Sequence, residues 1–191
     1  MSPSPQRAVA IGASAGGVQA LLALLPTLPA DFPWPIFIVL HVPADRSNVL
    51  APLFETKCHL EVKEAEDKET ARAGVVYFAP SDYHLLIESN GDLALSSDEV
   101  VNYSRPSIDV LFESAADAYG AGLTGVILTG ANEDGAAGLS AVTAAGGVAL
   151  VEEPAAAYAQ AMPLAARKAC AAARVLPLAR IAQHLKGLGT E

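Results

Sequence analysis

The chain has 191 residues, 52% of them hydrophobic, and a formal net charge of −9 at neutral pH. This length and apolar content are typical of one globular domain with a substantial core, and they exclude a disordered chain. Its 12 Lys and Arg residues are scattered and outnumbered by 21 acidic residues. Since attraction to phosphates needs clustered cations, the charge excludes a generic nucleic-acid or anionic-membrane binder.

The ends and the cysteines add two expectations. Residues 1–8 are predicted to form a flexible tail without the apolar middle of a signal peptide, and residues 9–187 a single domain. Apolar runs such as 36–40 are too short to span a bilayer. Cys58 and Cys170 have neither metal nor redox spacing and cannot form a disulfide framework. We therefore expect a cytoplasmic protein.

Short apolar runs alternate with helical patterns along the chain. The runs predict strands at 8–11, 36–40, 75–78, 84–88, 93–96, 126–129 and 148–151, and the patterns predict helices at 17–25, 107–119, 135–145, 163–172 and 178–186. Asn90-Gly91 separates two of these strands, as expected for a β-hairpin. The sequence therefore predicts a three-layer α/β sandwich with a mainly parallel, doubly wound sheet and an inserted β-hairpin.

Ser14 stands between the first strand and the first helix, within Gly-Ala-Ser-Ala-Gly. This matches the G-x-S-x-G pattern, in which glycines permit a sharp turn that exposes a nucleophilic hydroxyl. The N–H groups at the start of the following helix can bind an oxyanion. The alternatives are a phosphate-binding turn and a plain helix cap.

His41 and Asp134 also follow predicted strands, so both are expected in the crevice at the carboxyl ends of the sheet. His41 could accept the proton of Ser14, or it could be a structural histidine. Asp134 could orient that imidazole, or it could cap the next helix. Asn132 and Glu133 are adjacent, so spacing alone leaves the third member open. The order Ser, His, Asp differs from that of ordinary α/β-hydrolases.

The stretches IGASAGG, LHVP, YFAPSDYHLLI, SRPSIDVLFESAA, LTGANEDGAAGL and AMP occur in this order along the chain. Together they resemble the catalytic domain of the CheB chemotaxis protein-glutamate methylesterase family over about residues 9–185. The resemblance implies that Ser14 is the nucleophile, His41 the base and Asp134 the third triad member. It also implies a γ-methyl glutamate ester on cytoplasmic helices of a methyl-accepting chemoreceptor as substrate, and deamidation of receptor glutamines.

Two departures from the family pattern affect these expectations. A typical member carries a receiver domain before the catalytic domain, whereas only residues 1–8 precede the first strand here. A free-standing domain and a separate regulatory or receiver protein are therefore expected. The family often has Thr after the nucleophile and Met-Gly in its TGMG turn, where this chain has Ala15 and Ala131-Asn132. Backbone N–H groups of Ala15, Gly16 and Ala131 remain the predicted oxyanion donors.

His84, Arg105 and Met162 lie in the resembling stretches and are predicted to bind substrate. Each has an alternative: a structural histidine, a salt bridge and a packing residue, respectively. Asp109 is expected to support the turn before the third predicted helix. No His, Cys or Asp cluster has metal spacing, so neither a metal nor another cofactor is predicted.

Two other function classes remain. The first is a Rossmann-like nucleotide-binding module, but the first turn lacks G-x-G-x-x-G spacing, and the second strand ends in His41 rather than an acidic residue. The second is a catalytically silent signalling scaffold, against which the complete triad argues.

Overall fold

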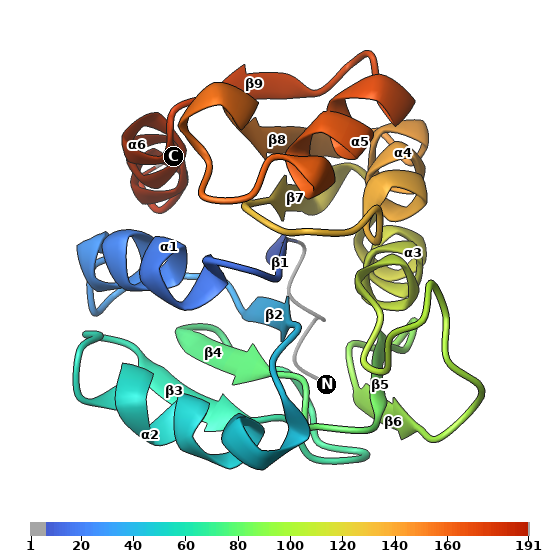
Figure 1. The fold of residues 1–191 in the computed structure, drawn as a ribbon. Helices are drawn as coiled ribbons and strands as arrows, with labels where there is room; N and C mark the ends of the chain where they lie inside the picture. Colours follow the sequence, from blue (N-terminus) through green and yellow to red (C-terminus); the bar gives the residue numbers. More distant parts are fainter. Residues whose placement is uncertain (1–6, 191) are drawn as a thin grey trace.

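A computed structural model describes residues 7–190 of the chain. Two layers of helices enclose a central sheet (Figure 1), and the predicted three-layer α/β sandwich is confirmed. Residues 1–6 of the predicted tail lie outside the described residues. Ala8 already belongs to the first strand and is buried, so the predicted tail extends one residue too far.

The main sheet has seven parallel strands in the order β3-β4-β2-β1-β7-β8-β9. They are β1 (Ala8–Ala13), β2 (Ile36–Leu40), β3 (Glu61–Glu64), β4 (Val75–Phe78), β7 (Leu123–Ile127), β8 (Val148–Glu152) and β9 (Arg174–Leu176). Strands β2, β4 and β3 from the first half of the chain lie on one side of β1. Strands β7, β8 and β9 from the second half lie on the other side. The sheet is therefore doubly wound, with its switch point beside β1.

Helices α1 (Gly17–Leu24), α2 (Leu50–Glu55) and α6 (Leu178–Leu188) cover one face of the sheet. Helices α3 (Ile108–Tyr119), α4 (Ala136–Ala144) and α5 (Ala161–Ala169) cover the other face (Figure 1). Alternate side chains of the central strands pack into the hydrophobic cores on the two faces of the sheet. In β2, for example, Ile36 and Ile38 pack on the first face and Phe37 on the second. Burial on both faces explains why these strands are continuously apolar.

The predicted hairpin consists of β5 (His84–Ile87) and β6 (Leu93–Ser96), which pair antiparallel and lie against α3 (Figure 1). Gly91 has φ 87° in the connecting turn, where its N–H donates to the Glu88 carbonyl. A positive φ is readily adopted by glycine, as the Asn-Gly pair indicates.

Sequence patterns missed β3, α2 and β9. The two strands are the edges of the sheet, where one face is exposed, so no continuous apolar run marks them. Strand β7 begins three residues earlier than predicted, because Thr124 and Gly125 interrupt its apolar run. Helix α5 begins at Ala161, so Pro163 lies in its first turn, where the missing N–H is tolerated.

Within residues 7–190, no helix is long and apolar enough to cross a membrane.

Candidate active site

The three candidate catalytic residues follow three neighbouring strands. Ser14 comes directly after β1, His41 directly after β2, and Asp134 lies in the loop between β7 and α4. Strands β2, β1 and β7 are adjacent and parallel, so their carboxyl ends lie at one edge of the sheet. This edge is the switch point of the fold, where α/β proteins place their ligands.

Ser14 is held by the backbone around it. Its N–H donates to the Thr129 carbonyl at 2.9 Å, and its own carbonyl accepts from Gly17 N at 2.7 Å. The hydroxyl of Thr129 donates to the Ala15 carbonyl at 2.8 Å. The turn thus joins the end of β1 to the end of β7 without using the Ser14 side chain, which is half-buried.

Gly16 gives this turn its shape. Its φ of 80° is one that other residues rarely adopt, and a Cβ added here would lie 2.6 Å from Cβ of Tyr158. The close packing of Tyr158 on Gly16 leaves no room for a side chain, although Tyr158 itself is 83% exposed.

The predicted oxyanion donors belong to two turns, Ala15 and Gly16 to the one after β1 and Ala131 to the one after β7. Within residues 7–190, the backbone N–H groups of Ala15, Gly16 and Ala131 donate to no backbone carbonyl. Ala15 and Gly16 directly precede α1, and Gly16 is its N-cap residue. The availability of these N–H groups is compatible with oxyanion binding, which remains a prediction.

His41 is positioned from two sides. Its backbone N–H donates to the Ala13 carbonyl at 3.0 Å, which brings it alongside the residue before Ser14. Its Nε2 lies 2.9 Å from Oδ2 of Asp134, and its side chain is 13% exposed. The distance is that of an ion pair, but the ring N–H is not well aligned with the oxygen. Catalytic hydrogen bonds are often poorly aligned until substrate binds.

The Asp134 carboxylate is fully buried and surrounded by donors. Besides His41, it accepts hydrogen bonds from the following groups: Ile108 N at 2.6 Å, Ser107 Oγ and Asn102 Nδ2 at 2.9 Å, and Asp109 N at 3.1 Å. Burial by itself raises the pKa of Asp134, but the donors outweigh burial and hold the pKa below its ordinary value. The carboxylate is therefore ionised and fixed at neutral pH.

The backbone donors to Asp134 come from α3 and not from the helix that Asp134 precedes. The carboxylate takes the place of a cap on α3, since the hydroxyl of Ser107 donates to Asp134 instead of accepting from its own helix. Ser107 is thus the N-cap residue of α3, but its side chain makes no capping hydrogen bond. In return, Oδ1 of Asp109 in α3 accepts from Gly138 N in the first turn of α4 at 2.7 Å. The two helix starts are capped by each other's carboxylates.

Asn102 joins the two carboxylates of this junction. Its Nδ2 donates to Asp109 Oδ2 at 2.7 Å and to Asp134 Oδ1 at 2.9 Å. Burial raises the pKa of Asp109, and the charge of Asp134 adds to this rise. Nothing in the sequence around Asn102 indicated this position, because its partners lie in α3 and in the loop after β7.

The two residues before Asp134 differ in exposure and in their contacts. Glu133 is exposed, whereas Asn132 is half-buried and its Nδ2 lies 3.3 Å from His41 Nδ1. Asn132 Oδ1 accepts from Asp134 N at 3.0 Å. The acidic residue of this turn that contacts His41 is therefore Asp134, with Asn132 on the other ring nitrogen. Among described residues, Ser14 Oγ has no hydrogen-bond partner, so it is not paired with His41 here.

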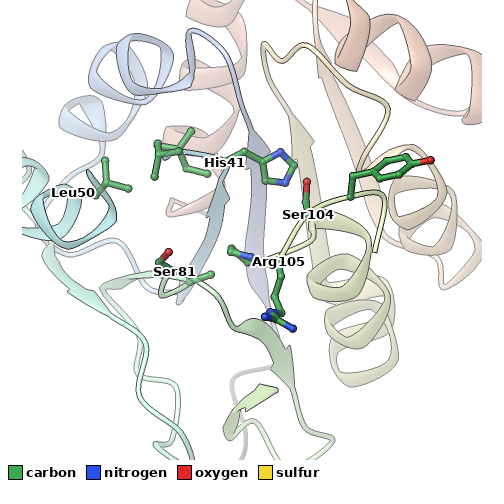
Figure 2. A pocket seen from close by; sticks show the side chains of 10 residues that line it. His41, Leu50, Ser81, Ser104 and Arg105 are labelled. Atoms are coloured by element: carbon green, nitrogen blue, oxygen red, sulfur yellow. The ribbon is translucent and has the colours of Figure 1, made fainter. Parts of the chain in front are cut away.

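A pocket of about 210 Å³ opens beside His41, on the side of β4 (Figure 2). Its wall comprises Leu40, His41, Val42, Leu50, Ala79, Ser81, Tyr103, Ser104, Arg105 and Pro106. Neither Ser14 nor Asp134 is part of this wall. Of the three candidate catalytic residues, His41 is therefore the one that lines this pocket.

The three predicted substrate-binding residues have different surroundings. His84 is buried, with Nδ1 accepting from Ser107 N and Nε2 bonded to the Glu99 carbonyl, so its side chain holds the start of α3. Met162 is buried against Gly130. Neither side chain reaches the pocket, and both positions correspond to the structural alternatives.

Arg105 does line the pocket, but its guanidinium turns away from His41 (Figure 2). It pairs with Asp82 at 2.7 Å and donates to the carbonyls of Ser97 and Asp98 at 3.0 Å. These contacts hold the loop before α3 against the hairpin, so the guanidinium is already engaged.

Sequence reasoning also missed the support of the Ser14 turn. Glu152, buried at the end of β8, accepts from Thr129 N at 2.8 Å, and burial raises the pKa of Glu152. The Thr129 hydroxyl accepts from Ala159 N at 2.8 Å, which fixes the loop of Tyr158. In the part of the chain that the structure describes, no group of three or more His, Cys, Asp or Glu side chains could hold a metal ion.

Comparisons with known proteins show which family this chain resembles. A model of the CheB methylesterase family matches residues 9–185. A Leptospira interrogans protein, provisionally named protein-glutamate methylesterase/protein-glutamine glutaminase, is 48% identical over 92% of this chain and 91% of its own length. A protein of Archaeoglobus fulgidus with the same two activities in its name is 37% identical over 93% of this chain, which spans 52% of that relative. The crystal structure of the Thermotoga maritima CheB methylesterase catalytic domain matches with a TM-score of 0.89 and 35% identity, over 95% of this chain and 98% of that one.

Proposed function

Because this chain belongs to the CheB methylesterase family, we propose that it hydrolyses glutamate γ-methyl esters on a protein, with Ser14 as nucleophile. The observation that supports this most is the contact of His41 with the buried, ionised Asp134, beside the turn that presents Ser14. A base oriented by a carboxylate next to a hydroxyl is the arrangement that acyl transfer requires.

The first half of the reaction forms an acyl-enzyme. The Ser14 hydroxyl attacks the ester carbonyl while its proton passes to His41. Since Nε2 faces Asp134, the nitrogen left to accept this proton is Nδ1. Asp134 stabilises the imidazolium that results, and the N–H groups of Ala15, Gly16 and Ala131 are the proposed donors to the oxyanion. Collapse of the tetrahedral intermediate breaks the bond to the methoxy oxygen, which leaves as methanol with the proton from His41.

The second half regenerates the enzyme. Water gives a proton to His41 and attacks the acyl-Ser14 carbonyl, and Ser14 leaves with that proton, so the products are the glutamate carboxyl group and free enzyme. The same steps release ammonia instead of methanol when the substrate is a glutamine side chain. We therefore propose deamidation as a second activity of this site, in line with the names of the relatives. No step uses a metal or another cofactor.

We propose that the substrate lies on the cytoplasmic helices of a chemoreceptor, which would place the protein in the cytoplasm. Two exposed aromatic side chains flank the site: Tyr158 packs over Gly16, and Tyr103 is fully exposed at the pocket beside His41. Tyrosine is enriched where proteins recognise each other, because it combines apolar area with a polar end. We propose that these two tyrosines contact the receptor helix.

Release of methanol from a receptor fragment carrying radiolabelled methyl groups tests the proposal. The protein should release label in step with enzyme concentration, with and without prolonged treatment with EDTA. A nucleotide-binding module would instead bind ATP or NAD and release no label. A silent scaffold would bind the fragment and leave its methyl groups in place.

A further inference from the structure

The side chain of Asn132 contacts both partners of the proposed acid–base pair. Its Nδ2 lies 3.3 Å from His41 Nδ1, and its Oδ1 accepts from the backbone N–H of Asp134 at 3.0 Å. A backbone N–H can only donate, so the oxygen of the carboxamide must face Asp134 and the NH₂ group must face His41. The orientation of the amide is therefore determined by chemistry.

This orientation also determines the form of His41. An NH₂ group can only donate, so Nδ1 presents its lone pair to Asn132. On the other side of the ring, Nε2 faces a carboxylate that its donors keep ionised, so Nε2 carries the proton. The two contacts thus favour the tautomer of His41 with its proton on Nε2 and its lone pair on Nδ1.

The lone pair that Asn132 occupies is the one that the reaction needs. Nδ1 must accept the proton of Ser14, yet Ser14 Oγ has no hydrogen-bond partner among the residues described. Loss of Asn132 would not disorder the imidazole, because Asp134 holds its other nitrogen and is itself fixed by Ser107, Ile108 and other donors. The hydrogen bond from Asn132 therefore stabilises His41 in the state before proton transfer, and it contributes little to the orientation of the ring.

We propose that the Asn132 carboxamide is a brake on the general base. Its N–H···Nδ1 hydrogen bond must open before the Ser14 proton can pass to Nδ1, so the hydrogen bond slows every acyl transfer at this site. This inference rests on the proposed roles of Ser14 and His41, and it makes Asn132 a positioning residue that acts through His41.

Two substitutions separate the two contacts of Asn132. Asn132→Ser retains an oxygen that can accept from Asp134 N, as serine does in such turns, but it is too short to reach His41. Asn132→Asp retains the same shape and the same acceptor, but it places a carboxylate oxygen where the donor was. The matched control is Glu133→Gln, an exposed neighbour in the same turn. Thermal melts confirm that each variant is folded.

The rate of Ser14 phosphonylation by a fluorophosphonate measures the brake without any receptor. In this reaction the Ser14 Oγ–P bond forms, the P–F bond breaks, and the hydroxyl proton passes to His41. Since one neutral hydrogen bond is lost, Asn132→Ser should react about two- to tenfold faster than the natural protein. Asn132→Asp should react at least about tenfold slower, because its carboxylate holds a proton on Nδ1. Glu133→Gln should remain within about twofold.

The ¹⁵N resonances of the His41 ring give a second readout. If Asn132 had only a structural role, its substitution would not shift them. At pH 8 we expect Nε2 to carry the proton, and Asn132→Ser should shift the Nδ1 resonance while Nε2 stays protonated. A proton on Nδ1 in the natural protein, or an unchanged or slower phosphonylation of Asn132→Ser, would overturn the brake. Neither readout uses a methyl ester. If the protein failed to release methanol, the proposed substrate would be refuted, but the test of the Asn132 brake would still stand.

Discussion

The two turns that carry Ser14 and Asp134 are built from similar sequences and hold their side chains in opposite ways. Both are glycine-containing connections between a central parallel strand and a helix. The Ser14 turn is fixed through backbone hydrogen bonds and the packing of Tyr158 on Gly16, and among described residues its hydroxyl has no partner. In the Asp134 turn, the side chain is buried, lies 2.9 Å from His41 Nε2 and accepts hydrogen bonds from Asn102 and α3.

The difference matches the chemistry that each side chain would perform. A nucleophile must move toward a carbonyl carbon and exchange its proton, so its position is best determined by the backbone. A carboxylate that orients a histidine must stay ionised and stationary, which requires several donors in a buried site. Removing the Ser14 hydroxyl should therefore affect activity alone, whereas replacing the Asp134 carboxylate should affect both activity and stability.

Ser14→Ala has the largest expected effect on activity. Removing the nucleophile should reduce release of methanol by at least about 10⁴-fold, as loss of the serine does in serine proteases. Because the hydroxyl makes no hydrogen bond with a described residue, Tm should stay within about 2 °C of the natural protein. Methanol release and thermal melts on the same preparation measure both, and near-normal turnover would remove the covalent mechanism.

Asp134→Asn should lower kcat by about 10³–10⁴-fold, because the amide can hold His41 in the wrong tautomer. It should also cost about 2–4 kcal/mol of stability at pH 7, since an NH₂ group would face donors that now bond to a carboxylate. The folded-state pKa of Asp134 is lowered, so this stability is present above the ordinary aspartate pKa and is lost as pH falls through the lowered value.

The difference in Tm between the natural protein and Asp134→Asn should therefore be smaller near pH 3 than at pH 7. Glu133→Gln and Glu152→Gln should change kcat by less than about tenfold. An active Asp134→Asn beside an inactive Glu133→Gln would show that the third triad member is misassigned.

Gly16→Ala tests whether the backbone positions Ser14. A φ of 80° and a Cβ that would lie 2.6 Å from Tyr158 should together cost about 1–3 kcal/mol and lower kcat about tenfold or more. Gly187→Ala in α6 is the matched control, because a Cβ there meets nothing within 4 Å, and it should be neutral or slightly stabilising. Equal kinetics for the two alanine variants would contradict the role given to the turn.

Glu152→Gln has the smallest expected effect. Burial raises the pKa of Glu152, so the natural protein loses stability as pH rises through that raised value. The glutamine carbonyl can still accept from Thr129 N without a buried charge. The variant should melt about 2–4 °C higher than the natural protein at pH 8, which corresponds to about 1 kcal/mol, and the gain should shrink near pH 4. A lower Tm at pH 8 would show that the ionised carboxylate stabilises the turn.

Much of the fold was predictable because its signals are local. The central strands are buried on both faces, so they read as continuous apolar runs, and Asn90-Gly91 marks the hairpin. The edge strands β3 and β9 escaped prediction because their patterns depend on exposure at the edges of the sheet. The position of Ser14 followed from its glycines for the same local reason.

The surroundings of the candidate site could not be predicted in this way. His84 and Arg105 stand in recognisable stretches, yet His84 binds the start of α3 and Arg105 binds Asp82 and carbonyls of a neighbouring loop. Asn132 was noticed as a departure from the family pattern, but no sequence pattern indicated that its amide faces His41. Such partners are decided by which segments the fold brings together.

By itself, then, the sequence determined which residues end the central strands, because apolar runs and glycine turns encode strand ends locally. Only the tertiary structure decided how those residues are bound. Asp134 caps α3 rather than its own helix because the packing of α3 against α4 brings the two helix starts within hydrogen-bond distance. Buried polar groups must find partners wherever the fold supplies them, and those partners lie more than twenty residues away along the chain.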